Sequence, residues 1–192
     1  MKAFLESLGL FNEADIKEIE SIAERRILKK GDFLIREGEI CREAAILSKG
    51  ILRSFYLSPT GEEITYCFLF PTSFVAAYSS LITGNPSAES LQAIAETEVY
   101  VISKQELDRL TDTHPGWQRL RMNLAEQQYV EFEKRIFSYQ KEKALQRYID
   151  LMTYQPEYIR HIPMQYLASY LAITPRHLSR LRRSVVSKDA GK

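Results

Sequence analysis

Short runs of alternating apolar and polar residues fill the chain from Arg26 to Ser103, and this pattern is typical of half-buried β-strands. Turn-forming residues such as Gly31-Asp32 and Lys49-Gly50 separate the runs, at the intervals of about 8 to 12 residues that β-sandwiches and barrels show. The pattern therefore predicts an all-β core. Its strands are expected at RRILKKG, DFLIREG, AAILSKG, ILRSFYL, EITYCFLF, ESLQAIA and EVYVIS.

Helical spacing occurs on both sides of these strands. Asn12 is placed to cap a helix from Phe11 to Glu24, whose apolar stripe is Ile16, Ile19, Ile22 and Ala23. Ser103 and Glu106 have the spacing of a capping box, which predicts a short helix through Leu110. The β-core is thus expected to have a helix at each end.

A longer helix is predicted from Pro115 to about Ser138, with two apolar stripes on opposite faces. Two opposed stripes need two partners. We expect one to pack on the β-core of its own chain and the other on the same helix of a second subunit; the alternative is that both are buried within one chain. The first stripe is Trp117, Leu120 and Leu124, and the predicted dimer seam is Met122, Ala125, Tyr129, Phe132 and Ile136.

The C-terminal part is expected to form short helices around a tight turn. Lys141 to Tyr154 predicts a helix with Leu145, Tyr148, Ile149 and Met152 inward, followed by an extended connector from Tyr158 to Pro163. From Ile162 to Arg183, the small Ala168 and the N-cap Thr174 before Pro175 predict two helices in close contact. Their shared apolar residues are Leu167, Leu171, Ile173, Leu178 and Leu181.

The last of these helices has a charged face. Arg176, Arg180 and Arg183 lie at i, i+4 and i+7, opposite an apolar face of Leu178, Leu181 and Val185. The whole chain has a net charge of only +1, but residues 54–103 contain five acids and no lysine or arginine, whereas residues 158–192 contain seven basic residues and one acid. Such a separation is expected when one end of a protein meets a polyanion. The alternative is a solvated basic helix end.

The pieces LASYL, ITP and LSRLR resemble the helix-turn-helix of the Crp/Fnr family of bacterial transcription regulators. The pieces KKGDFLIREGE and ILSKGILRSFYLSPTGEEITYCFLFPTSF resemble the β-roll of cyclic-nucleotide-binding domains, the sensor half of those regulators. The resemblance implies an α+β protein. Its parts would be a double-stranded β-helix or jelly-roll sensor domain at residues 1–114, a dimerisation helix at 115–138 and a helix-turn-helix DNA-binding domain at 139–192.

The resemblance also implies that the helix from Pro175 to Arg183 enters the major groove of DNA. Arg176 and Arg180 match positions that read base edges, and an arginine that donates two bonds to guanine is worth about 1 to 3 kcal/mol of discrimination. Ala172 departs from the family, which usually has glycine in this turn. Glycine is usual there because alanine is strained at positive φ. Thr174, His177 and Ser179 match contacts to phosphates or bases, so the predicted DNA-binding set is Thr174, Arg176, His177, Ser179, Arg180 and Arg183.

The segment FVAAYSSLITGNPSAESLQA matches the phosphate-binding part of the sensor domain but lacks its chemistry. Ala76 and Ala77 replace the family's glycine and acid, and no arginine is present to hold the phosphate. We therefore expect no binding of cyclic AMP in the family's usual way, and a pocket that is lost or retuned. An uncharged or aromatic molecule could instead lie against Tyr66, Phe74 and Tyr78, although such aromatics are more often core.

Other classes find little support in the sequence. A cupin-type enzyme would hold its metal with several histidines, but the first histidine, His114, follows the last strand. Cys41 and Cys67 have no metal-ligand spacing, and no nucleophile elbow or phosphate loop is present. We predict neither an enzyme nor a metal protein. No segment has the roughly 20 apolar residues of a membrane span, and a cytoplasmic protein is expected.

These observations favour a homodimeric transcription regulator that binds a pseudo-palindromic site in double-stranded DNA. The resemblance adds RNA polymerase as a partner, and leaves open whether a small effector exists. The alternative is a small-molecule sensor whose helical end docks a protein. A steep loss of duplex binding with salt would distinguish the two, because each neutralised phosphate adds about −0.9 to the salt slope.

Overall fold

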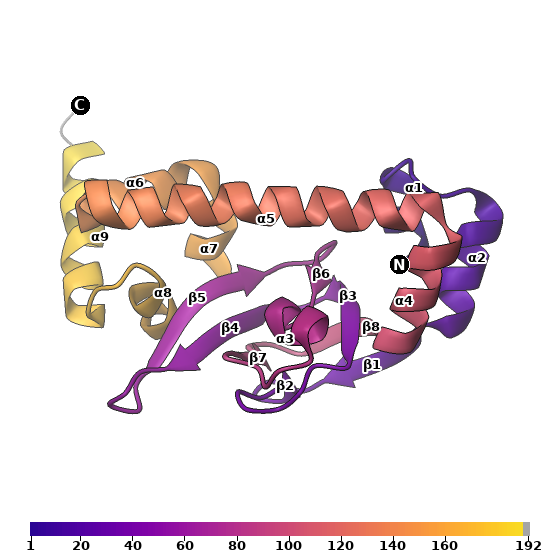
Figure 1. Cartoon of the computed structure of the whole chain (residues 1–192). Coiled ribbons are helices and arrows are strands. Elements are labelled where there is room, and N and C mark those ends of the chain that lie inside the picture. The colour runs from indigo at the N-terminus through magenta and orange to yellow at the C-terminus, as the bar shows by residue number, and fades with distance from the viewer. Residues whose placement is uncertain (190–192) are drawn as a thin grey trace. The chain divides into compact units, whose positions relative to one another are not determined.

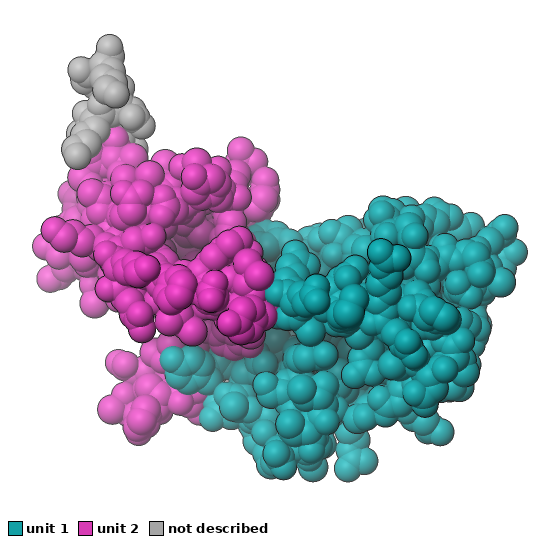
Figure 2. Space-filling view, turned by 45° about the horizontal axis from the view of Figure 1, so that its top comes forward, with its two compact units in different colours: residues 1–56, 68–128 teal, residues 57–67, 129–192 magenta. Residues whose placement is uncertain are grey.

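The computed structural model describes the backbone of residues 1–189 and the side chains of residues 1–185 (Figure 1). Contacts divide the chain into two compact units, which Figure 2 shows in different colours. The first unit comprises residues 1–56 and 68–128, and the second comprises residues 57–67 together with the chain from residue 129 onward.

Antiparallel strands form two four-stranded sheets, with the orders β1-β8-β3-β6 and β2-β7-β4-β5. Each of the seven predicted runs forms a strand, and the short β6 is an addition to the prediction. Gly50 makes the turn between β3 and β4 at φ +85, where an added Cβ would lie 2.4 Å from the Glu96 carbonyl oxygen. The strands are β1 (Glu24–Leu28), β2 (Phe33–Ile35), β3 (Glu43–Lys49), β4 (Leu52–Leu57), β5 (Glu63–Leu69), β6 (Phe74–Val75), β7 (Ser90–Ala93) and β8 (Thr97–Ser103).

Alternation along the strands places one face of each sheet in the core. Leu47 pairs with Val99 across β3 and β8, and Leu52 pairs with Ala93 across β4 and β7; all four side chains are buried in one hydrophobic cluster. Opposite residues in an antiparallel pair lie on the same face of the sheet, so the core lies between the two sheets. The predicted jelly-roll is confirmed.

Helices precede, interrupt and follow these strands along the chain: α1 (Lys2–Ser7), α2 (Glu13–Ile22), α3 (Tyr78–Thr83), α4 (Lys104–Thr113) and α5, which begins at Pro115 in the first unit and ends at Lys141 in the second. The Asn12 cap is confirmed as a capping box with Asp15. Ser103 caps α4 as predicted, but the Glu106 carboxylate accepts from Arg109 instead of completing the box, and α4 continues past Leu110. Prediction missed α1, whose short apolar run is buried through Leu5.

The stripe of α5 that was expected to face the roll does so. Trp117 and Leu120 are buried in the core cluster, and Leu124 packs against it. Trp117 makes an edge contact with Phe74, with ring centroids 6.2 Å apart. The first turns of α5 are therefore anchored in the first unit by apolar contacts.

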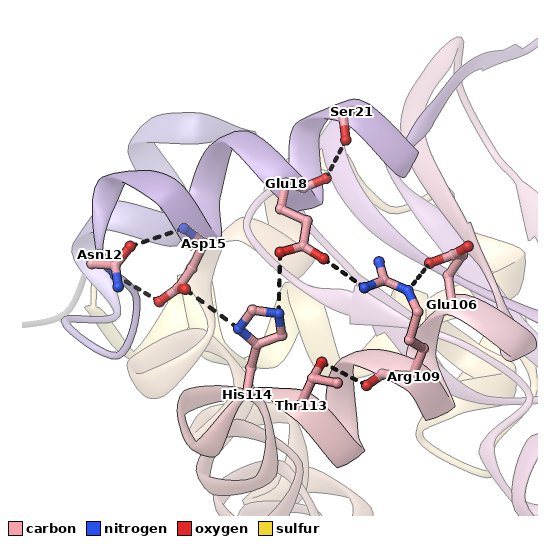
Figure 3. A network of polar contacts seen from close by, with 8 residues as sticks. All are labelled: Asn12, Asp15, Glu18, Ser21, Glu106, Arg109, Thr113 and His114. Atoms are coloured by element: carbon pink, nitrogen blue, oxygen red, sulfur yellow. Dashed lines mark hydrogen bonds and ion pairs between the residues drawn. The ribbon is translucent and has the colours of Figure 1, made fainter.

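A polar network fixes α2 to the junction of α4 and α5 (Figure 3). His114 lies at this junction, with Nδ1 3.3 Å from an Asp15 oxygen and Nε2 3.1 Å from a Glu18 oxygen. Arg109 on α4 approaches the other Glu18 oxygen with Nη1 at 2.6 Å. Glu18 is therefore held between two cationic or proton-donating side chains. The hydrogen bond from Arg109 is the main cause that lowers the pKa of Glu18 below its ordinary value of 4.5.

The lowered pKa of Glu18 predicts a pH-dependent contribution to stability. A carboxylate whose pKa is lower in the folded protein stabilises the fold above its unfolded pKa, and this contribution is lost as the pH falls through the folded value. The gap in unfolding free energy between the wild-type protein and Glu18→Gln should therefore narrow between about pH 5.5 and about pH 2.5 in urea titrations. Glu20→Gln, an exposed acid of the same helix, is the control. A gap that stays constant across this range would contradict the prediction.

The second unit contains the C-terminal helices, α6 (Ala144–Tyr154), α7 (Pro156–His161), α8 (Met164–Tyr170) and α9 (Pro175–Asp189). Two predictions were wrong here. The extended connector expected from Tyr158 is mostly the helix α7, because Pro156 occupies its first turn, where the missing N–H does no harm. On α6 the buried residues are Tyr148 and Leu151, whereas Ile149 and Met152 are each 36% exposed. The helix begins only at Ala144, and its buried face is narrower than the predicted stripe.

Candidate nucleic-acid interface

Helices α8 and α9 pack through small and apolar side chains. Leu167, Leu171 and Leu178 are fully buried, and so is Ala168, which confirms that a small side chain is required where the helices meet. Leu181 and Val185, further along α9, are half-buried. Prediction placed the end of this helix at Arg183, but it extends to Asp189. The leucine face therefore fixes the first half of α9 most firmly.

The turn between the two helices has the predicted geometry. Ala172 adopts φ 54, in the left-handed region where a side chain is strained. The Thr174 hydroxyl accepts a hydrogen bond of 3.2 Å from the backbone N–H of His177, as an N-cap should, and Pro175 occupies the first helical position. Local signals in the sequence thus fix the start of α9.

The face of α9 opposite the leucines presents a row of cations. Arg176, Arg180 and Arg183 are all exposed, and no ion pair joins them to the carboxylates whose side chains are described. His177 and Ser179 are half-buried at the sides of this row. A guanidinium that faces solvent can donate two parallel hydrogen bonds to guanine or bind a phosphate. We call Arg176, Arg180 and Arg183 the arginine row.

Exposed apolar side chains cover α5 beyond its anchored first turns. The residues of the predicted seam are exposed: Met122 by 55%, Tyr129 by 67%, Phe132 by 48% and Ile136 by 54%, with Ala125 among them. Prediction missed Val130 and Phe137, each 44% exposed, because they lie beside the strict heptad positions. Monomeric proteins rarely leave such a continuous apolar surface in water. We call these seven residues the α5 apolar surface.

A cavity of about 140 Å³ lies in the first unit, and the predicted pocket residues are only partly in it. Ala76 and Ala77 line the cavity. Phe74 instead packs on Phe4, with ring centroids 5.4 Å apart, and belongs to the core, while Tyr78 at the start of α3 is 42% exposed. Neither these two aromatics nor Tyr66 lines this cavity, so the structure does not bring them together with Ala76 and Ala77 there. The lining residues are Leu34, Ile35, Glu39, Ile40, Cys41, Arg42, Glu43, Ala76, Ala77 and Leu91.

The residues around this cavity do not fit a cyclic nucleotide. Arg42, which sequence reasoning missed, is accompanied by the acids Glu39 and Glu43, and Glu43 is already paired with Arg26 at 2.6 Å. The nearby acid Glu89 does not line the cavity, and its carboxylate accepts a hydrogen bond from the Ser54 hydroxyl. The cavity is lined mainly by apolar side chains, with two acids and one arginine, and this lining disfavours the binding of a phosphodiester.

Calorimetric titration with cyclic AMP is therefore expected to give no binding at micromolar concentrations. The physical reason is the cost of burying a phosphodiester beside acids without an added cation. Cyclic GMP and adenosine are the matched titrants, since adenosine lacks the phosphate. Saturable binding of either cyclic nucleotide in the micromolar range, with adenosine inactive, would contradict this prediction.

A metal site would need several ligands to converge within the described part of the chain. No group of three histidine, cysteine, aspartate or glutamate side chains is arranged there to hold a metal ion. Burial raises the pKa of the Cys41 thiol, which disfavours the reactive thiolate. No described helix is both long and apolar enough to cross a membrane.

Fold and site together define a class of protein: a β-roll followed by a long helix and a pair of helices packed across a tight turn. Residues 25–114 match the family described as cyclic nucleotide-binding domain. The chain is 29% identical over 137 residues to the transcriptional activator protein Anr of Pseudomonas protegens; the match covers 71% of this chain and 55% of that protein. The chain thus spans about half the length of the curated relatives it matches.

Solved structures share the fold. FixK2 of Bradyrhizobium japonicum superposes with a TM-score of 0.75 at 17% identity, covering 88% of this chain and 86% of that one. A protein of Eubacterium rectale described as a transcriptional regulator of the Crp/Fnr family gives a TM-score of 0.74 at 17% identity, covering 97% and 88%. The chain therefore shares its fold with a regulator of the Crp/Fnr family.

Proposed function

We propose that this protein is a homodimeric transcription regulator that reads the major groove of duplex DNA with α9. The single observation that carries the proposal is the arginine row, exposed on a helix whose reverse face is fixed by buried leucines. The likeness to a transcriptional activator supports it. A rigid helix with cationic side chains on one face fits the major groove, which is wide enough to admit it.

Dimerisation is proposed through the α5 apolar surface. Two copies related by a twofold axis would bury these side chains against each other and present two α9 helices to one duplex. Half-sites about 34 Å apart, one turn of DNA, would then be contacted together. We assign the sensor domain to residues 1–114, the dimerisation helix to 115–138 and the DNA-binding domain to 139–192.

Within α9 we assign base reading to Arg176 and Arg180, and phosphate contact to Arg183. The exposure of all three arginines supports these roles. Thr174, His177 and Ser179 complete the proposed interface from its sides, although the Thr174 hydroxyl also serves as the helix cap. RNA polymerase is the proposed protein partner in the cytoplasm.

The test is selection of bound duplexes from a random library with the purified protein. We expect recovered sequences to contain two inverted half-sites at one fixed separation, because a dimer imposes its own symmetry on the site. Binding to the selected duplex should weaken steeply with salt, since arginines that neutralise phosphates release counterions. Failure to enrich any sequence would contradict the proposal and favour docking to a protein. Recovery of duplexes that contain only one half-site would contradict the proposed dimer.

A further inference from the structure

Side chains from outside the helix-turn-helix bind the end of α8, within the second unit. The Tyr139 hydroxyl, on α5, donates a hydrogen bond to the Tyr170 carbonyl oxygen. Arg147, on α6, donates from Nη2 to the Leu171 carbonyl oxygen at 3.1 Å. These carbonyls belong to the last turn of α8, where backbone acceptors have no partner within their own helix. Two helices remote in sequence thus cap α8.

Arg147 binds a second helix end at the same time. Its Nη1 donates to the carbonyl oxygen of Glu142 at 2.6 Å, immediately after the last residue of α5. One guanidinium therefore joins the C-terminal ends of α5 and α8, and its positive charge suits the partial negative charge of both ends. Arginine can do this because its donors lie in a rigid planar fork, whereas lysine offers a single flexible ammonium.

Aromatic rings hold these donors in place. The Arg147 guanidinium carbon lies 4.8 Å from the centre of the Tyr139 ring, and that of Arg135 lies 4.3 Å from the centre of the Tyr170 ring. Tyr158 packs edge-on against Tyr170, with centroids 5.5 Å apart. Burial raises the pKa of both Tyr158 and Tyr170, as expected for rings enclosed by neighbouring helices. The donors are therefore packed from several sides.

The position of this contact gives it a consequence for α9. Leu171 directly precedes Ala172, whose left-handed backbone turns the chain toward the Thr174 cap of α9. A turn with a strained residue needs fixed neighbours to keep a single conformation. Holding the last carbonyls of α8 against the end of α5 therefore fixes where α9 begins relative to α5.

We propose that Tyr139 and Arg147 are positioning residues that set the separation between the two DNA half-sites. The inference rests on the proposed function. In a dimer joined through α5, the orientation of each α9 relative to α5 determines how far apart the two α9 helices meet the duplex. Neither residue is proposed to contact DNA. Loosening the contact should leave each α9 able to read its half-site while the accepted distance between half-sites varies more widely.

The experiment measures binding to a set of duplexes that share the selected half-sites and differ in the number of base pairs between them. Arg147→Lys keeps the charge and removes the fork. Tyr139→Phe keeps the ring and removes the hydroxyl donor, which leaves the Tyr170 carbonyl only the longer bond of 3.5 Å from Arg135 Nη2. Arg160→Lys is the control, an exposed arginine of α7 whose partner is Glu157 at 3.1 Å. The preference for the best separation over its neighbours should fall by about tenfold in both variants, the equivalent of about one hydrogen bond. It should be unchanged in the control.

Other results would overturn the inference. A thermal midpoint that falls while the separation profile stays as in the wild-type protein would mean that the contact serves stability alone. Loss of preference for the half-site sequence itself would place these residues in base reading. If Arg147→Lys does not fold, Tyr139→Phe decides the outcome, since it removes one oxygen atom. A wild-type protein that selects no duplex would instead refute the proposed function, and this inference with it.

Discussion

Arg180→Ala is expected to abolish discrimination between the selected duplex and a scrambled one, while salt-dependent binding to both persists. Arg180 lies in the middle of the arginine row and is exposed, with Leu178 buried behind it. A bidentate arginine–guanine pair is worth about 1 to 3 kcal/mol, and a dimer uses the residue twice, so the loss should be about 2 to 6 kcal/mol. Competition binding with both duplexes at several salt concentrations measures it.

The salt dependence separates base reading from general attraction. Alanine removes one cation from each subunit, and the slope of affinity against salt should fall only slightly, by about 0.9 for each phosphate contact that is lost. Arg160→Ala, which removes an exposed arginine of α7, should change neither discrimination nor half-site preference. Discrimination that survives in Arg180→Ala would remove this residue from the reading face and leave Arg176 as the candidate.

Phe132→Glu is expected to convert the dimer into a monomer and to weaken DNA binding strongly. Phe132 lies within the α5 apolar surface and is 48% exposed in the single chain. A twofold interface would bury both copies, each worth about 1.5 to 3 kcal/mol, and the substitution would also bring two carboxylates together. Sedimentation or light scattering measures the mass of the protein in solution. Titration with the selected duplex measures its affinity for DNA.

A matched control lies on the same helix. Lys134 is exposed on another face of α5, with Glu131 as its partner at 2.9 Å, and Lys134→Gln should leave the mass unchanged because exposed ion pairs contribute little. A wild-type protein that is monomeric at all concentrations, or a Phe132→Glu variant that stays dimeric, would contradict the proposed interface. Retained dimerisation with lost DNA binding would point to a change in the fold.

Local chemistry made much of this fold predictable. Alternation and glycine-containing turns were enough to place seven strands, and the capping residues Asn12 and Thr174 fixed the starts of α2 and α9. Leucine spacing together with charge predicted that the arginine row would face solvent. These features depend on residues within one or two turns of each other, so a sequence shows them directly.

What could not be predicted depends on contacts between distant residues. Arg147 meets the carbonyl oxygen of a residue 24 positions away, and no spacing rule relates the two. Phe74 and Tyr78 looked equally able to line a pocket, but one side chain entered the core and the other faced solvent, because only tertiary packing decides which side of a short strand or helix is covered. The same holds for Arg42 at the cavity.

The α5 apolar surface makes the oligomeric state of this protein depend on its own concentration. If a second copy covers that surface, dilution dissociates the dimer and exposes the aromatic side chains of both chains to water. Mass action then favours unfolding of the helix or aggregation. Unfolding midpoints should rise with protein concentration. In a cell, newly made chains would become competent only after meeting one another, so the onset of binding would depend on the square of their number.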